Sequence, residues 1–244
     1  MVSMDKISIA ISTRNRPSTF KKVVHEILKK TPIDVMNFFT VDDASDYPYS
    51  DADYRFKERA GISAVKNKCL QLCYESDADH FFLFDDDTYP ISDNWWIPYV
   101  KSKQQHLSYT FGPGMVICSD IVTSFRLSGD HVRCTTEYHT KSHIVPNGCM
   151  TYFTRECIDK VGGFDTNYPN KYEHTDLSRR IFNSGITQTP YIDVVNSDKL
   201  IYCLDQDIAI QRSFTEQEMK DNLNKGYEYF RSREKSSAYI EFRT

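Results

Sequence analysis

The sequence contains no long hydrophobic run. No stretch of its 244 residues approaches the roughly 18 consecutive apolar residues that a membrane-spanning helix requires. Residues 1–5 lead directly into a strand-like segment, without the apolar core of a signal peptide. From the sequence we therefore expect no integral membrane segment and a cytoplasmic location.

Paired cysteine motifs are also missing. No C-x-x-C pair occurs among the seven cysteines, and their odd number and irregular spacing fit neither a zinc ribbon nor a disulfide framework. We expect reduced thiols, most of them buried, at Cys69, Cys73, Cys118, Cys134, Cys149, Cys157 and Cys203.

The chain has no excess of positive charge. Its formal net charge is -4, which argues against a protein whose affinity comes mainly from nucleic-acid phosphate backbones. A hydrophobic content of 40% over this length is enough for one large core. No internal repeat or low-complexity tract interrupts the sequence, so we expect one globular domain with a short appendage.

The first third of the chain alternates strand and helix patterns. In residues 6–12 polar or small side chains alternate with apolar ones, and several are β-branched. A polar loop follows at 13–17, and apolar residues then recur at helical spacing between positions 20 and 28. The pattern repeats, with strands expected at 34–41 and 80–84 and a helix at 62–73. This alternation predicts an α/β fold with a largely parallel sheet and ligands at the carboxyl ends of the strands.

The rest of the chain is less regular. We expect a short helix at 96–105 and a strand at 109–118, then a strand at 149–154 and helices from Arg155 and at 174–183. Thr215 and Glu218 form a capping-box pattern for a last helix that ends near Arg231. The predicted domain organisation is a main domain at 1–205 and a C-terminal helical extension at 206–244 that packs on it.

Three consecutive carboxylates follow the apolar residues 81–84. Asp85, Asp86 and Asp87 repel one another, and a bound divalent cation would relieve that repulsion. In an extended segment Asp85 and Asp87 point the same way, so these two side chains can reach one ion together. The alternative for an isolated acidic triplet is a solvated turn.

A second acidic pair, Asp42 and Asp43, ends the preceding strand. A carboxylate at this place suits a ribose hydroxyl or a base edge, and the loop from Thr13 to Arg16 suits phosphate or base. Lys66 and the adjacent Asn67 lie on the following helix, within reach of a nucleotide. For each of these groups a local role, as a turn former or on an exposed helix face, is the alternative.

A third group of titratable residues begins a later helix. Glu173, His174 and Asp176 lie within four residues, which makes them candidates for a general base. Acidic residues in a first helical turn are also stabilised by the helix dipole, so Asp176 could have only this role.

The order of these motifs resembles glycosyltransferase family 2 and its relatives of the GT-A fold. The resemblance covers about residues 4–200, and the ordered set is more specific than any one motif. The matching segments are Ser12-Thr13-Arg14-Asn15-Arg16-Pro17, Val41-Asp42-Asp43-Ala44-Ser45, Lys66-Asn67, Asp85-Asp86-Asp87, Asn147-Gly148-Cys149-Met150, Gly163-Phe164-Asp165 and Glu173-His174-Thr175-Asp176-Leu177.

The resemblance implies a fold with a Rossmann-like nucleotide-binding half and a mostly parallel central sheet flanked by helices. It also implies transfer of a sugar from a nucleotide-sugar, of UDP type, to a hydroxyl acceptor, with Mn2+ or Mg2+ held by Asp85 and Asp87. The implied donor-binding residues are Thr13, Arg14, Asn15, Arg16, Asp42, Asp43, Lys66, Asn67, Asp86 and Gly148. The implied acceptor-binding residues are Trp95, Trp96, Cys149, Met150 and His143.

The chain departs from the family pattern in two places. The family has Glu-Asp where this chain has Glu173-His174, so Glu173, His174 and Asp176 all stay open as the base, and inversion is expected but retention is not excluded. Relatives also place a metal-binding histidine after the next strand, but no histidine follows His174 here. Asn196 or Asp198 could replace it as a metal ligand.

Two other classes of protein compete with a transferase. A sugar nucleotidylyltransferase usually carries a glycine-rich phosphate loop after its first strand, and residues 13–18 contain no glycine. A non-catalytic carbohydrate-binding or scaffold protein with the same fold would tolerate loss of Asp85 and Asp87.

The sequence leaves the identity of the acceptor open. A glycan, a protein, a lipid-linked sugar and a hydroxylated nucleobase in DNA all fit. The basic and histidine side chains that would suit DNA are Arg126, Arg133, Lys141, His131, His139 and His143.

Overall fold

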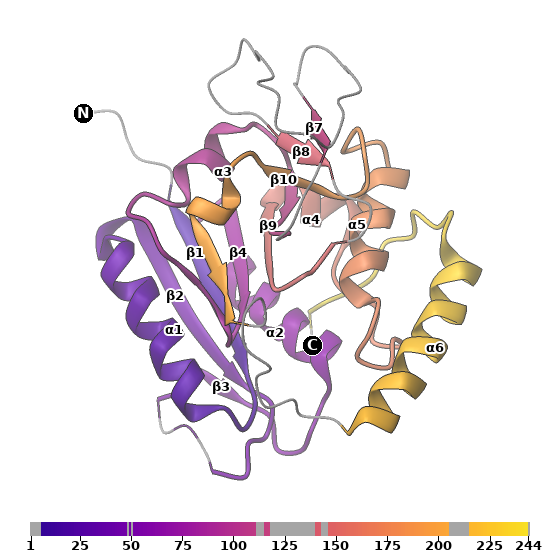
Figure 1. Ribbon diagram of the computed structural model, residues 1–244, viewed down its shortest axis with the longest axis horizontal. Helices are drawn as coiled ribbons and strands as arrows, with labels where there is room; N and C mark the ends of the chain where they lie inside the picture. Colours follow the sequence, from indigo (N-terminus) through magenta and orange to yellow (C-terminus); the bar gives the residue numbers. More distant parts are fainter. Residues whose placement is uncertain are drawn as a thin grey trace.

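The computed structural model describes residues 6–47, 49, 51–110, 115–117, 140–142, 146–204 and 215–243. A six-stranded sheet in the order β3-β2-β1-β4-β9-β6 forms its centre (Figure 1). The strands of this sheet are β1 (Ile7–Thr13), β2 (Met36–Asp42), β3 (Tyr54–Arg55), β4 (His80–Asp85), β6 (His106–Ser108) and β9 (Met150–Thr154). β1 pairs in parallel with β2 and β4, and β2 with β3, whereas β9 runs antiparallel to β4 and β6. The predicted α/β fold with a mostly parallel sheet is confirmed.

Helices cover both faces of this sheet because side chains of a strand alternate between its faces. On one face Ile7, Ile9 and Ile11 of β1 pack with Val23 and Ile27 of α1 (Pro17–Lys30). Trp95, Trp96 and Tyr99, at and before α3 (Ile97–Lys101), complete that core.

On the other face Ala10 packs with Val65, Cys69 and Leu70 of α2 (Ile62–Glu75). Residues of α4 (Arg155–Val161) and α5 (Glu173–Asn183) continue this second core. The sheet therefore separates two apolar layers.

Two smaller sheets flank the large one. One contains β10 (Ile192–Val194), β8 (Thr140–Ser142) and β7 (Met115–Ile117), and the other pairs β11 (Ile201–Cys203) with β5 (Thr88–Pro90). These strands have three residues each, too few for a period-2 pattern to stand out in a sequence. Two short 3-10 helices, η1 (Ile33–Val35) and η2 (Ser197–Lys199), precede β2 and β11.

Several predicted boundaries need correction. The helix expected at 96–105 is only α3, because Lys103 has a left-handed backbone with φ of 59°. Where one strand was expected at 109–118, β6 ends at Ser108, before this range, and β7 covers Met115–Ile117 within it. The run expected as a strand from position 34 begins instead with η1, and β2 starts at Met36.

The C-terminal helix α6 (Glu216–Arg233) lies beside α5 (Figure 1). The predicted capping box is present, with Thr215 and Glu218 each accepting a hydrogen bond from the other's backbone N–H. Phe230 stacks on Tyr172 with ring centroids 5.7 Å apart, and beyond the helix Phe242 is buried in the second core. The boundary expected at residue 205 adjoins residues outside the described ones, so the division into two parts stays a prediction.

None of the helices in the described ranges has the length and apolar character needed to cross a membrane.

Candidate active site

The sheet register brings three strand ends together. Thr13 at the end of β1 is opposite Asp42 of β2, and Ser12 is opposite Asp85 of β4. Because the three strands run in parallel, their carboxyl ends meet at one edge of the sheet. The polar motifs predicted to act together are therefore neighbours in space.

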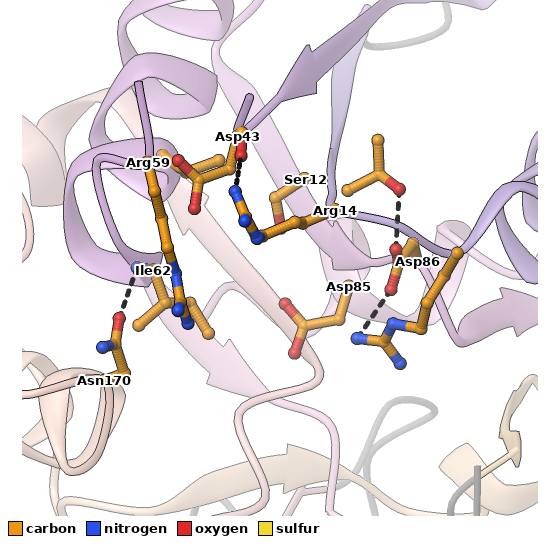
Figure 2. Close-up of a pocket in the computed structure, with 11 residues that line it drawn as sticks. Ser12, Arg14, Asp43, Arg59, Ile62, Asp85, Asp86 and Asn170 are labelled. Carbon is orange, nitrogen blue, oxygen red and sulfur yellow. Dashed lines mark hydrogen bonds and ion pairs between the residues drawn. The ribbon is translucent and has the colours of Figure 1, made fainter. Parts of the chain in front are cut away.

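A pocket of about 110 Å³ opens at this edge (Figure 2). Asp43, Arg59 and Asn170 lie toward one side of it in this view, and Asp85 and Asp86 toward the other. Six of the predicted donor-site and metal-site residues line it: Thr13, Arg14, Arg16, Asp43, Asp85 and Asp86.

The loop after β1 is held by the loop after β2. The Arg14 guanidinium donates to the backbone carbonyls of Asp43 and Ala44, at 2.6 and 3.0 Å. The backbone N–H of Asn15, whose φ is 54°, donates to the Ser45 hydroxyl. These contacts fix two loops as one wall of the pocket before any ligand binds.

Asp42 and Asp43 have different environments. Asp42 is fully buried, accepts hydrogen bonds from the backbone and hydroxyl of Ser45, and pairs with Arg55. Asp43 accepts from the backbone N–H of Ala60 but also lines the pocket. The structure therefore assigns Asp42 to the support of the loop, which corrects its prediction as a donor-binding residue, and leaves Asp43 for a ligand.

The aspartate triplet is partly neutralised by protein groups. Thr13 Oγ1 donates to Asp86 at 2.7 Å, and Arg16 bridges Asp86 and Asp87 at 2.9 Å each. Burial raises the pKa of Asp86 to about 7, although Arg16 and Thr13 oppose the shift. Burial also raises the pKa of Asp85, against the effect of Lys66.

Lys66 joins this group to the third predicted motif. Its Nζ lies 3.2 Å from Asp85 Oδ1 and 3.7 Å from Glu173 Oε1, and it donates to the Gly148 carbonyl at 3.1 Å. The lysine is buried and does not line the described pocket. It lies behind Asp85, which lines the pocket, and direct contact of Lys66 with the donor stays a prediction.

Glu173 and His174 form a pair at the start of α5. His174 Nδ1 lies 3.2 Å from Glu173 Oε1, and Nε2 lies 3.3 Å from the Pro146 carbonyl oxygen. Burial alone would raise the pKa of Glu173, but His174 and Lys66 outweigh burial and lower the pKa to about 2. Among the residues that the structure describes, Oε2 of Glu173 has no hydrogen-bond partner although it is buried.

Gly148 packs closely against the His174 ring. Its φ is 71°, and a Cβ atom there would overlap the His174 ring. Gly148 therefore lies against the His174 ring and supplies a carbonyl to Lys66, and its contact with a donor stays a prediction.

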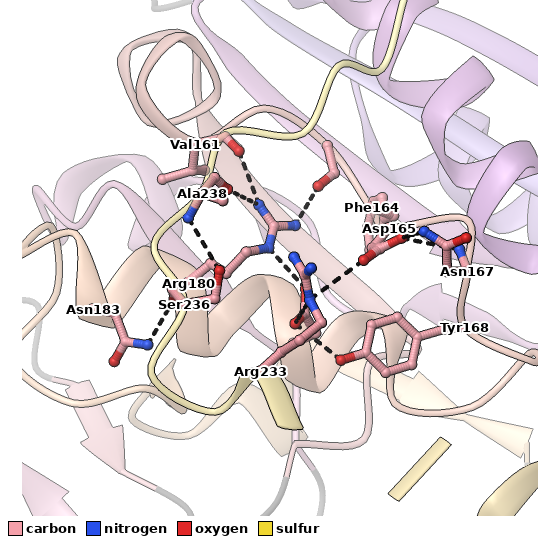
Figure 3. Close-up of polar contacts among 12 residues, drawn as sticks. Val161, Phe164, Asp165, Asn167, Tyr168, Arg180, Asn183, Arg233, Ser236 and Ala238 are labelled. Carbon is pink, nitrogen blue, oxygen red and sulfur yellow. Dashed lines mark hydrogen bonds and ion pairs between the residues drawn. The ribbon is translucent and has the colours of Figure 1, made fainter. Parts of the chain in front are cut away.

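Asp176 lies in a separate buried network. It accepts from Tyr168 at 3.0 Å and pairs with Arg180 at 2.7 Å. The Arg180 guanidinium also donates to the Val161 carbonyl at 2.9 Å, and Arg233 of α6 lies 3.7 Å from Asp176 (Figure 3). With both oxygens engaged, Asp176 is a structural acid, which corrects its prediction as a candidate base.

Four residues predicted to bind the acceptor are buried. Trp95, Trp96, Cys149 and Met150 belong to the first core, and the Trp95 indole donates to Thr31 at 3.0 Å. Side chains in this position stabilise the sheet, and contact of these four residues with an acceptor stays a prediction. His143 lies outside the described residues.

Asn67 and Asp198 are also placed away from the pocket. Asn67 makes two hydrogen bonds with the backbone of Phe164, at 2.8 and 2.9 Å, which corrects its prediction as a donor ligand. In the β5–β11 pair Cys203 is opposite Thr88, next to Asp87. At the other end of the pair, the Ile91 N–H donates a hydrogen bond to the Leu200 carbonyl. Asp198 is exposed in η2, beyond that end of the pair, and its role as a metal ligand stays a prediction.

Five residues of the pocket were not predicted as site residues: Ser12, Arg59, Ile62, Val65 and Asn170. Arg59 and Ile62 precede and begin α2, and Asn170 accepts from the Ile62 backbone N–H at 2.9 Å across a sequence separation of 108 residues. No local pattern in the sequence marks Asn170, because only the approach of the α4–α5 connection to α2 gives it this place.

In the ranges that the structure describes, no group of three or more His, Cys, Asp or Glu side chains is arranged to hold a metal ion. Asp85 and Asp87 nevertheless fit a hard divalent cation in their chemistry. Both offer carboxylate oxygens, and the charge of Asp87 contributes to the raised pKa of Asp85. A cation held by two carboxylates keeps open positions for diphosphate oxygens and water.

The chain matches no protein-family model and no curated protein. It is similar to solved structures of glycosyltransferases, among them the following three. The mannosyltransferase PcManGT of Pyrobaculum calidifontis, in complex with GDP-Man and Mn2+, is 14% identical with a TM-score of 0.53, over 75% of this chain and 54% of that one. GalNAc-T7 with UDP, GalNAc and Mn2+ is 15% identical with a TM-score of 0.60, over 80% and 44%.

S. aureus TarS, residues 1–349, is 13% identical with a TM-score of 0.53, over 81% of this chain and 60% of that one. In each comparison the chain spans less than two thirds of the other structure. The sheet order and these structural similarities show the fold: this chain has the GT-A fold of glycosyltransferases.

Proposed function

We propose that this chain is a metal-dependent glycosyltransferase that takes a sugar from a nucleotide-sugar, of UDP type, to a hydroxyl acceptor. One observation carries the proposal: in a GT-A fold, polar side chains from β1, β2 and β4 line one pocket at the carboxyl ends of those strands. Two of the similar structures contain Mn2+ together with a nucleotide or nucleotide-sugar.

The donor would occupy the pocket with its nucleoside toward Asp43 and Arg59 and its diphosphate toward Asp85. Asp85 and Asp87 would hold Mn2+ or Mg2+, which when bound offsets the negative charge of the departing diphosphate. Arg14, fixed by two backbone carbonyls, keeps the wall of the nucleoside side in place.

The base that we propose is His174, oriented by Glu173. Because the ionised Glu173 accepts a hydrogen bond from Nδ1, the ring nitrogen that remains for proton transfer is Nε2. In the neutral ring that can act as a base, Nε2 carries no proton and does not donate to the Pro146 carbonyl; an acceptor hydroxyl that takes the place of that carbonyl would give its proton to Nε2 as it attacks the anomeric carbon. Attack opposite the leaving diphosphate inverts the configuration of the sugar.

Nucleotide binding tests this proposal without knowledge of the sugar or the acceptor. UDP and GDP with Mn2+ should each be scored for thermal stabilisation, since a ligand at 100 times its Kd stabilises the folded state by about 2.7 kcal/mol. We expect stabilisation by one nucleotide, its loss with a chelator, and its loss in Asp85→Asn. Equal melting temperatures with and without nucleotide and metal would contradict the proposal.

A further inference from the structure

Arg16 is the counter-ion of two aspartates in the candidate active site. Its Nη2 lies 2.9 Å from Asp86 Oδ1 and its Nη1 lies 2.9 Å from Asp87 Oδ2. Both carboxylates are largely buried, with side-chain exposures of 2% and 12%. The guanidinium therefore provides positive charge where a divalent cation would provide it.

Arg16 occupies the oxygen of Asp87 that a cation needs. The other oxygen, Oδ1, accepts from the Thr88 hydroxyl at 3.1 Å and has the Cys203 thiol 3.9 Å away. Each oxygen of Asp87 thus has a neighbour, and Arg16 is the one of these neighbours that carries a charge. A divalent cation on Asp87 would sit beside this guanidinium and be repelled by it.

The backbone of Arg16 is held, so its side chain is the part that can move. The backbone N–H donates to the Tyr49 hydroxyl at 3.0 Å, and the carbonyl accepts from the Phe20 N–H and the Thr19 hydroxyl at the start of α1. The side chain is 23% exposed and lines the pocket. It can therefore turn from the aspartates toward a ligand without a change in the fold.

We propose that Arg16 is an exchangeable counter-ion, which leaves Asp87 when the donor's divalent cation arrives and then pairs with the donor's diphosphate. This rests on the function proposed above. Phosphate oxygens bind guanidinium in the bidentate manner that carboxylates do, so the arginine exchanges one anion for another. The divalent cation takes the place of Arg16 on the aspartate.

This exchange couples the two ligands. Without nucleotide, cation binding must separate Arg16 from Asp87, so the guanidinium loses one of its two carboxylate partners. With nucleotide, the diphosphate receives the guanidinium, so the cation binds more tightly. By linkage the cation must strengthen nucleotide binding by the same factor.

The test is titration of the full chain with Mn2+, followed by electron paramagnetic resonance, with and without UDP. We expect Arg16→Gln to bind Mn2+ alone roughly tenfold more tightly than wild type. We also expect UDP to enhance Mn2+ affinity less in Arg16→Gln than in wild type. Arg16→Lys, which keeps the charge without the bidentate geometry, should fall between the two.

Arg14→Gln is the matched control for Mn2+ binding without UDP. Its guanidinium comes from the same loop but donates to the backbone carbonyls of Asp43 and Ala44, so its removal should leave Mn2+ affinity near the wild-type value. Equal or weaker Mn2+ binding by Arg16→Gln, with wild type binding the ion, would overturn the Arg16 proposal alone. If wild type binds no Mn2+ even with UDP, the proposed function fails and the exchange fails with it.

Discussion

Lys66 is the residue that connects the donor side of the site to the base side. Burial would lower its pKa, but Asp85 and Glu173 outweigh burial and raise it, so this lysine stays charged. Its ammonium lies between the two carboxylates and separates their charges. The arrangement keeps Glu173 ionised, and an ionised Glu173 is what orients His174.

A substitution of His174 tests which group accepts the proton. A carboxylate base keeps its proton-accepting form to lower pH than a histidine base does. We expect His174→Asp, which introduces the residue of the family that the sequence resembles, to move the acid limb of the kcat profile to lower pH. With its pKa near 2, Glu173 itself does not titrate in the range of this limb.

Glu173→Gln is the control for this profile. It keeps the side-chain size but removes the charge that orients His174, so kcat should fall about tenfold or more while KM for the donor changes little. An acid limb that is the same in wild type and His174→Asp would assign the base to another residue.

At the scale of elements, α6 holds the connection that leads into α5. Gly226 of α6 approaches so closely that an added Cβ would lie 2.8 Å from the Lys171 carbonyl and 3.0 Å from the Tyr172 ring. Tyr172, with φ of 71°, is the residue directly before Glu173. The position of the C-terminal helix is thereby linked to the position of Glu173 and of His174, the proposed catalytic base.

Gly226→Ala should therefore destabilise the protein, although alanine is the better helix former by about 1 kcal/mol. We expect a net loss of about 1–3 kcal/mol in unfolding free energy, from overpacking against the backbone, together with a lower kcat. Urea unfolding measures the first effect. Asn224→Ala, on the exposed side of the same helix, is the matched control and should be neutral or slightly stabilising; equal behaviour of the two variants would refute the close approach.

For the molecule as a whole, the sequence predicted the fold where periodicity is strong. β1, α1, β2, α2 and β4 are long enough for the periods of strand and helix to appear, and their order determines the parallel sheet. The three-residue strands β5, β10 and β11 depend on pairing partners far away in the chain, and a local pattern cannot show that pairing.

The candidate site was predictable where side chains follow directly from a strand end. Thr13, Asp43 and Asp85 lie in the pocket because the register of parallel strands places them there. Tertiary contacts decide the other positions: Trp95 is buried by the packing of α1 and β4, and Asn170 reaches the pocket through a connection between helices. Burial and contacts between residues far apart in the chain cannot be predicted from residue spacing.

The central claim is most directly tested by turnover of a panel of nucleotide-sugars with Mn2+, with release of the nucleoside diphosphate as the measured quantity. We expect hydrolysis of one donor, its loss with a chelator, and a fall of roughly 100-fold or more in Asp85→Asn/Asp87→Asn. The control Asp34→Asn/Asp221→Asn removes two exposed carboxylates that do not line the pocket and should keep the wild-type rate. Failure of wild type to cleave or bind any donor, or equal rates in wild type and the Asp85/Asp87 double variant, would contradict the claim and favour a non-catalytic protein of this fold.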